Sequence, residues 1–201
     1  ARKHFVAMTD KDASKSKLRT IVEAGDILLS GLVHDDVGGR FSIFDDATLF
    51  ALAFCGMTKE QMKELLEGSL KAQEAFLSDD ININKAAQQA VFNAEARKNG
   101  KIKHFVELFG DAFEGEQLWE KQLKNESLKE RISTDTNVGP AYLHYNAESD
   151  LAPGNNDSFY TFVYVKPEDN TTKAVLSGVI KAYSDQHPVS CIELSDLSPK
   201  S

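Results

Sequence analysis

The chain has 201 residues, of which 41% are hydrophobic and 27% are charged, and its formal net charge is -8. These values are ordinary for a globular protein with a hydrophobic core, built as one large domain or two small ones. An acidic chain without a basic stripe predicts that nucleic acid is not a partner. No apolar run reaches about 18 residues and no signal-like segment is present, so we expect no membrane association and a cytoplasmic location.

The first 57 residues predict two helices joined by short polar segments. Ser14 or Ser16 can cap the first helix, whose apolar positions continue until Gly31 ends it. Asp45 or Asp46 caps the second helix, and Gly56 ends it. This part of the sequence resembles no family that we can name.

The middle of the chain predicts a series of further helices. Thr58 and Gln61 have the spacing of a capping box, in which each side chain binds the other residue's free backbone amide. A second helix is predicted over residues 84–98. The apolar residues in 102–109 predict another turn or two, and residues 118–132 contain the last clear helix of this region.

The C-terminal third predicts strands and one late helix. Residues 133–157 read mostly as loop, with a short strand at 141–145. Residues 158–165 are rich in aromatic and β-branched side chains, which favours a half-buried strand. A helix follows over residues 171–183, and alternating apolar and polar residues at 189–194 predict a final strand.

The late helix has an alternative, in which residues 173–182 form a β-hairpin with the preceding strand. Gly178 weakens both interpretations, because glycine costs about 1 kcal/mol relative to alanine inside a helix. The helix is favoured, because apolar residues repeat at i and i+4 over a run longer than most strands.

The order of the predicted elements is helices first and strands later. This order indicates an α+β fold, with N-terminal helices packed on a small C-terminal antiparallel sheet that one late helix interrupts. We expect residues 1–57 to form a helical segment and residues 58–201 to form the α+β domain, or both to form one continuous domain. Residues 133–137 are the best candidate for a boundary within the chain.

One triplet, His34-Asp35-Asp36, has the residue types of a divalent-metal site. With His4 it has the spacing of HD-type metal-dependent phosphohydrolases, and it is also similar to the aspartate-rich motif of polyprenyl synthases. Both families are all-helical, which the C-terminal strands contradict, and the synthase motif needs an aspartate where Gly39 stands. A polar loop after a helix is the alternative. We assign no catalytic, cofactor-binding or metal-binding residue, and His34 and Asp35 stay as metal candidates.

A family resemblance rests on the C-terminal strand–helix–strand segment. Its motifs are Tyr164-Val165-Lys166-Pro167, Thr171-Thr172 and Leu176-Ser177-Gly178-Val179-Ile180-Lys181-Ala182, followed by Leu194 and Pro199. Residues 84–114 look like the mid-domain helices of the same family. Over about residues 58–201 the chain resembles the N-terminal domain of soluble guanylate cyclase α subunits, which has the heme–nitric-oxide-binding-like (H-NOX-like) fold.

The resemblance implies a domain without heme or any other cofactor. Heme-binding members carry a Tyr-x-Ser-x-Arg motif before the late helix, where this chain has Val165-Lys166-Pro167-Glu168-Asp169. No histidine between residues 111 and 141 can serve as the axial ligand. The implied function is that of a non-catalytic, heme-free regulatory domain of a cyclase-type signalling protein, which contacts a protein partner or a paired subunit.

Two other functions stay open. One is an HD-type metal-dependent phosphohydrolase that uses His4, His34 and Asp35. The other is a standalone cytosolic α+β interaction protein. A metal-dependent hydrolysis assay distinguishes the first from the rest, and a pull-down of a paired subunit distinguishes the cyclase domain from the standalone protein.

Overall fold

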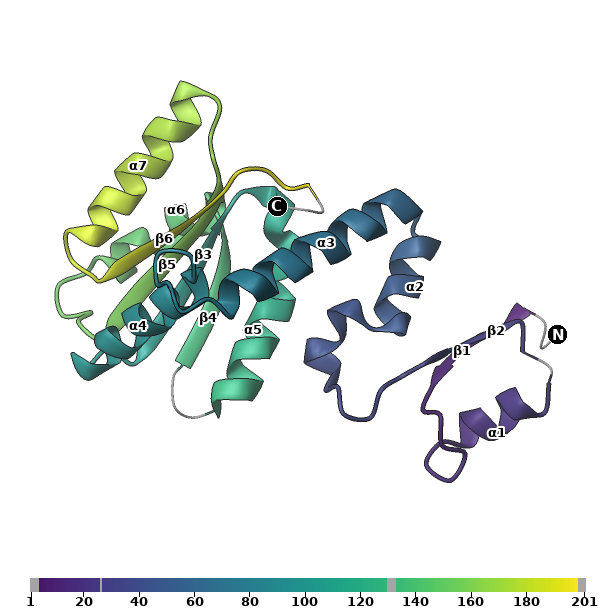
Figure 1. Cartoon of the computed structure of the whole chain (residues 1–201). Coiled ribbons are helices and arrows are strands. Elements are labelled where there is room, and N and C mark those ends of the chain that lie inside the picture. The colour runs from purple at the N-terminus through teal and green to yellow at the C-terminus, as the bar shows by residue number, and fades with distance from the viewer. Residues whose placement is uncertain (1–3, 26, 130–132, 199–201) are drawn as a thin grey trace. The chain divides into compact units, whose positions relative to one another are not determined.

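The computed structural model describes residues 4–25, 27–129 and 133–198. The chain divides into two compact units between Glu67 and Gly68, within helix α3, and each unit is described by itself (Figure 1). The predicted division into residues 1–57 and 58–201 stays a prediction. Among the described residues, no helix combines the length and the hydropathy needed to cross a bilayer.

The N-terminal unit begins with a β–α–β motif. Strands β1 (Val6–Thr9) and β2 (Leu29–Leu32) pair in parallel, and helix α1 (Lys17–Glu23) connects them. The Ser16 side chain caps α1, as predicted. The predicted length of this helix is wrong, because Gly25 follows it with a φ of 88°, a backbone conformation that favours glycine and ends helices. The apolar residues that were expected to extend the helix form β2 instead.

The rest of this unit confirms the predicted helix starts. The elements are η2 (Gly39–Phe44), α2 (Asp46–Phe54) and the first part of α3 (Lys59–Phe76). The Asp45 side chain caps α2. The Thr58 amide donates to Gln61 Oε1 at 2.9 Å, and the Gln61 amide donates to Thr58 Oγ1 at 3.2 Å. These reciprocal bonds are the predicted capping box.

The C-terminal unit is built on a four-stranded parallel sheet in the order β4–β3–β5–β6. The strands are β3 (Lys103–Phe109), β4 (Ser133–Gly139), β5 (Ser158–Val165) and β6 (Val189–Leu194). The other elements are α4 (Lys85–Lys98), η3 (Asp111–Phe113), α5 (Glu114–Leu128), α6 (Ala141–Asp150) and α7 (Asn170–Ser184). Helices therefore alternate with parallel strands in an α/β arrangement (Figure 1). The predicted α+β fold with an antiparallel sheet is wrong.

The central strand β3 is the main correction to the predicted elements. Its residues were expected to form helical turns, but they pair with β4 on one side and β5 on the other. A parallel strand covered on both faces lacks the alternation that identifies a half-buried strand. The run Lys103-His104-Phe105-Val106-Glu107-Leu108-Phe109 is of this kind, and it is too short for periodicity alone to separate helix from strand.

The region after α5 also differs from the prediction. The candidate boundary is strand β4, whose sequence is polar, and the predicted strand that follows is helix α6. Side chains of α5 bind the β4 backbone: Gln117 Nε2 donates to the Thr136 carbonyl at 2.8 Å, and Asn125 Nδ2 donates to the Thr134 carbonyl at 2.9 Å. These contacts are tertiary, so local propensity does not predict them.

The sheet has two covered faces. Helices α6 and α7 pack on the face that carries Tyr160 and Phe162, together with Leu143 and Tyr183 from the helices themselves; we name it the α6/α7 face. The opposite, α4/α5 face carries Val106 and Leu108, which pack with Phe113. Tyr160 and Phe162 are completely buried, so the core of this unit lies directly on β5.

The late helix is confirmed as α7, and the hairpin alternative is wrong. Asp169 caps it, and its buried side chains are Leu176 and Tyr183. Val179 and Ile180 pack against the cluster that contains Tyr160 and Phe162. The strand–helix–strand segment was therefore predicted correctly, although its two strands are parallel neighbours.

Replacing Leu176 by alanine should lower the free energy of unfolding by about 2–5 kcal/mol, because it leaves a cavity under α7. Lys181→Ala, on the exposed side of the same helix, should change it by less than about 1 kcal/mol, since it removes only an exposed ion pair with Asp185. Urea unfolding monitored at Trp119, the single tryptophan of the chain, measures both values. Equal losses in the two variants would contradict this packing.

Candidate functional site

A cavity of about 470 Å³ lies at the carboxyl ends of β3 and β5. Both strands contribute their last residues, Phe109 and Val165, and α7 contributes its first turn. The lining residues are Phe109, Gly110, Asp111, Ala112, Phe113, Pro140, Val165, Lys166, Pro167, Thr171, Thr172, Val175 and Leu197. Its volume lies within the range typical of small-molecule sites.

The topology of the sheet explains why the cavity lies here. From β3 the chain continues through α5 to β4, and from β5 it continues through α7 to β6 on the other side. The two connections therefore diverge to opposite faces of the sheet (Figure 1), and the cavity lies where they part, at the ends of β3 and β5. In open parallel sheets this divergence is where ligands bind.

The turn after β3 depends on Gly110. Its φ is 135°, a value that side chains other than hydrogen rarely allow, and its amide donates to the Gly139 carbonyl at 3.1 Å. The turn leads into η3 and places Asp111 on the cavity lining. Asp111 is the carboxyl residue among the described lining residues.

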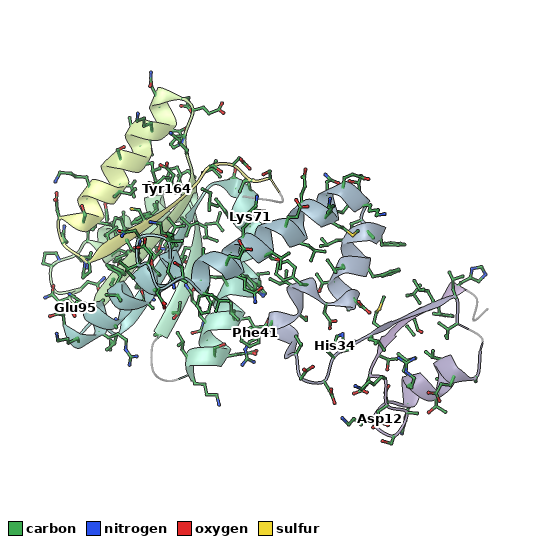
Figure 2. All side chains as sticks on the ribbon, viewed as in Figure 1. Asp12, His34, Phe41, Lys71, Glu95 and Tyr164 are labelled. Atoms are coloured by element: carbon green, nitrogen blue, oxygen red, sulfur yellow. The ribbon has the colours of Figure 1, made fainter. Side chains whose placement is uncertain are left out.

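The opposite wall is the start of α7. Thr171 and Thr172 line the cavity there. Lys166 directly follows β5, the strand on which Tyr164 is labelled in Figure 2. The Asp169 carboxylate accepts a hydrogen bond from the Thr172 amide at 2.8 Å. Hydrogen bonds from the Thr172 backbone and hydroxyl hold the pKa of Asp169 below its usual range. One carboxylate of the chain itself therefore already occupies the positive end of this helix.

The cavity thus combines an apolar surface with a few polar groups. Phe109, Phe113, Val165 and Val175 supply apolar contact area. The ammonium of Lys166 and the threonine hydroxyls can bind an anionic or hydroxylated ligand. This combination suits a small polar molecule that carries a negative group.

The metal candidates His34 and Asp35 lie elsewhere, in the loop after β2 of the N-terminal unit (Figure 2). The Asp35 carboxylate accepts a hydrogen bond from the Lys15 ammonium at 2.5 Å, which lowers the pKa of Asp35. His34 Nε2 is 3.8 Å from Asp45 Oδ1. These two residues line a pocket of about 290 Å³.

The parallel register of β1 and β2 separates His4 from this loop. His4 precedes β1, whereas His34 and Asp35 follow β2, and Val6 pairs with Leu29. The two positions are thus at opposite ends of the strand pair, more than about 10 Å apart at about 3.3 Å per residue. Within the described ranges, no three His, Cys, Asp or Glu side chains are grouped as metal ligands would be. The structure gives the phosphohydrolase hypothesis no support.

Sequence reasoning missed the residues of the cavity. Gly110 and Asp111 were assigned to a segment read as helical, and Lys166 was used only for the cyclase resemblance. Thr171 or Thr172 was also expected to cap the late helix, which is wrong because Asp169 caps it. The available signal was a glycine directly after one apolar strand and a pair of threonines at the start of a helix after another. That signal depends on recognising β3 as a strand.

No protein-family model matches the chain. Among curated proteins, the glucose-6-phosphate isomerase of Bacillus cereus (strain AH187) is 31% identical over 127 residues, which are 63% of this chain and 27% of the relative. The glucose-6-phosphate isomerase of Clostridioides difficile (strain 630) is 33% identical over 128 residues, with the same two coverages. The chain thus spans about a quarter of the length of these relatives, which are named as enzymes.

Two solved structures share the fold. The hypothetical protein TT0462 from Thermus thermophilus superposes with a TM-score of 0.83 at 22% identity, over 99% of this chain and 53% of that one. A glucose-6-phosphate isomerase from Chlamydia trachomatis superposes with a TM-score of 0.72 at 17% identity, over 99% and 45%. At these identities the likeness concerns the fold alone.

These comparisons overturn the cyclase resemblance. The parallel sheet is not the predicted antiparallel H-NOX-like sheet, and the curated relatives and one of the two solved structures are named as glucose-6-phosphate isomerases. The predicted regulatory role in cyclase signalling is therefore wrong, and the comparisons give no support to the standalone interaction protein. The chain has the α/β fold of these two solved structures and resembles part of the sequence of curated glucose-6-phosphate isomerases.

Proposed function

We propose that this chain supplies a sugar-phosphate-binding unit of a glucose-6-phosphate isomerase-like protein, with the ligand in the cavity between β3 and β5. The observation that carries the proposal is the position of this cavity, at the divergence of the two crossovers in a parallel sheet. The names of the similar proteins supply the ligand class.

The lining residues have the chemistry that such a ligand requires. Lys166 lines the cavity and its ammonium can pair with a phosphate, and the hydroxyls of Thr171 and Thr172 can donate to the phosphate oxygens. Asp111 can accept hydrogen bonds from sugar hydroxyls. Val165 and Val175 provide apolar contact for the less polar face of a sugar ring.

Isomerisation itself moves a proton between neighbouring carbon atoms and requires a general base in contact with the substrate. The matched part is 27% of each relative, so the proposal assigns binding to this chain and isomerisation to the type of protein it resembles. The expected association with a protein partner and the cytoplasmic location stay predictions.

Isothermal titration of the chain with glucose 6-phosphate and with fructose 6-phosphate tests the proposal directly. Both should bind more tightly than glucose or inorganic phosphate alone, because each of these lacks half of the recognised groups. Equal or absent binding of all four compounds would refute it. A coupled assay for interconversion of the two sugar phosphates then measures whether the chain alone catalyses the reaction.

Lys166→Ala should weaken sugar-phosphate binding about tenfold or more, because a charge-assisted hydrogen bond contributes about 1.5–3 kcal/mol. Lys71→Ala is the matched control, since it removes an equal charge from an exposed position on α3, outside the cavity (Figure 2). The ratio of the two dissociation constants gives the result. Similar weakening in both variants would indicate a general charge effect and would count against Lys166 as the phosphate ligand.

Asp169→Asn should strengthen sugar-phosphate binding several-fold. Asparagine still caps a helix, so α7 keeps its start, but the negative charge beside the cavity is removed. Asp185→Asn, at the other end of the same helix, is the control and should leave affinity unchanged. Salt titration sharpens the comparison, because the gain should shrink as ionic strength rises. A loss of affinity in Asp169→Asn would place the phosphate away from α7.

A further inference from the structure

A carboxyl group lies in the middle of the parallel sheet, away from the proposed ligand cavity. Glu107 is on β3, the central strand, and only 1% of its surface is exposed. Asn137 Nδ2, on the neighbouring strand β4, donates to its Oε1 at 3.0 Å. Its Oε2 has no hydrogen-bond partner. A buried carboxylate would normally satisfy both oxygens, since an unpaired buried charge is costly.

The groups around Glu107 on the α6/α7 face do not favour a negative charge. Asp150 on α6 and Asp135 on β4 are carboxyls whose charges act against it, Asp150 more strongly. Asp135 is itself paired with the Lys121 ammonium of α5 at 2.7 Å. A negative charge on Glu107 also raises the pKa of three nearby phenols, those of Tyr142 on α6, Tyr160 on β5 and Tyr183 on α7. The histidine that faces this layer, His187 after α7, donates from Nε2 to the Asp150 carbonyl oxygen at 3.0 Å.

A second buried polar atom lies on the same face without a partner. The Tyr160 hydroxyl is buried and unbonded, and its residue pairs in register with Phe105, two positions before Glu107. Asp150 is also buried, and its carboxylate accepts from the Tyr183 hydroxyl at 2.9 Å. The layer between the sheet and these two helices thus holds the carboxyls of Glu107 and Asp150, three phenols and the buried His187 imidazole, whose Nδ1 also has no hydrogen-bond partner.

We propose that Glu107 is a proton-dependent switch for this layer: its neutral form lets α6 and α7 pack on the sheet, and loss of its proton loosens them. The neutral acid removes the repulsion from Asp150 and Asp135. Ionisation restores that repulsion inside a region from which water is excluded. Opening of α6 and α7 relieves it by admitting water to the carboxylate.

The direction of the pH dependence follows from the buried position. Burial raises the pKa of Glu107 from 4.5 to about 7, and the charges of Asp150 and Asp135 also raise it. The hydrogen bond from Asn137 acts in the opposite direction and lowers it. The closed state therefore holds the proton more tightly than the open state. Closed-state stability is complete below about pH 4.5, falls as the pH rises through about 7, and is constant above that value.

Hydrogen exchange measured by mass spectrometry tests this switch on the whole chain. After correction for the intrinsic pH dependence of exchange, the opening of residues 141–150 and 170–184 should increase between about pH 5 and pH 7.5 by on the order of a hundredfold. Helix α4, on the opposite face, is the internal control and should change much less.

Glu107→Gln is the matched variant, because its amide oxygen can still accept from Asn137 and it carries no charge. In this variant the pH dependence of α6 and α7 opening should disappear. An unchanged dependence in Glu107→Gln would overturn the proposal, and so would an equal response of α4, because the switch would then not be confined to this layer.

Infrared spectroscopy provides a measurement that does not require the variant to fold. The wild-type chain should show the carbonyl stretch of a protonated carboxylic acid at about pH 6, well above the ordinary pKa of glutamate, and should lose it by about pH 8. Asp150→Asn should retain the band, which excludes Asp150 as its source, and Glu116→Gln should retain it as well. Absence of the band in the wild type, or its loss in Asp150→Asn, would overturn the proposal.

Discussion

The central position of β3 is the constraint on which the C-terminal unit depends. It pairs along its whole length with β4 and with β5, and helices cover both of its faces. Its backbone is therefore satisfied by two neighbours, and its side chains fill two separate cores. The cavity follows from the same arrangement, because the chain leaves the end of β3 toward one side and the end of β5 toward the other.

Two titratable side chains of β3 point to opposite faces and respond to pH in opposite directions. His104 stacks on Phe159 and lies 2.9 Å from the Thr161 hydroxyl; burial, with a contribution from Lys124, lowers its pKa to about 3. Its contribution to stability is present above pH 6.5 and is lost as the pH falls. That of Glu107 is lost as the pH rises. In the mildly acidic range the two contributions oppose each other. The free energy of unfolding therefore changes less with pH than either contribution alone would make it change.

Local signals were enough for much of the fold. The caps at Ser16, Asp45 and Thr58, the helices α4 and α7, and strands β5 and β6 all follow from propensity and periodicity. β3, β4 and α6 do not, because a doubly buried strand lacks alternation and the polar β4 is held by side chains of α5. A strand–helix–strand unit already implies parallel neighbours, since such a crossover returns the chain in the same direction. The antiparallel sheet was expected from the order of helices first and strands later, and this expectation overlooked the crossover. Because β3 was not recognised as a strand, the cavity at its end was missed as well.

The pairing of β3 with β5 also determines when this unit can form during synthesis. Lys103 pairs with Ser158 and Phe109 with Tyr164, so the central strand leaves the ribosome long before its second neighbour exists. Contacts that are distant in sequence form slowly, and a strand with an open edge exposes unpaired amides while it waits. A nascent chain that stops before β5 would therefore present an apolar, half-paired strand to the cell.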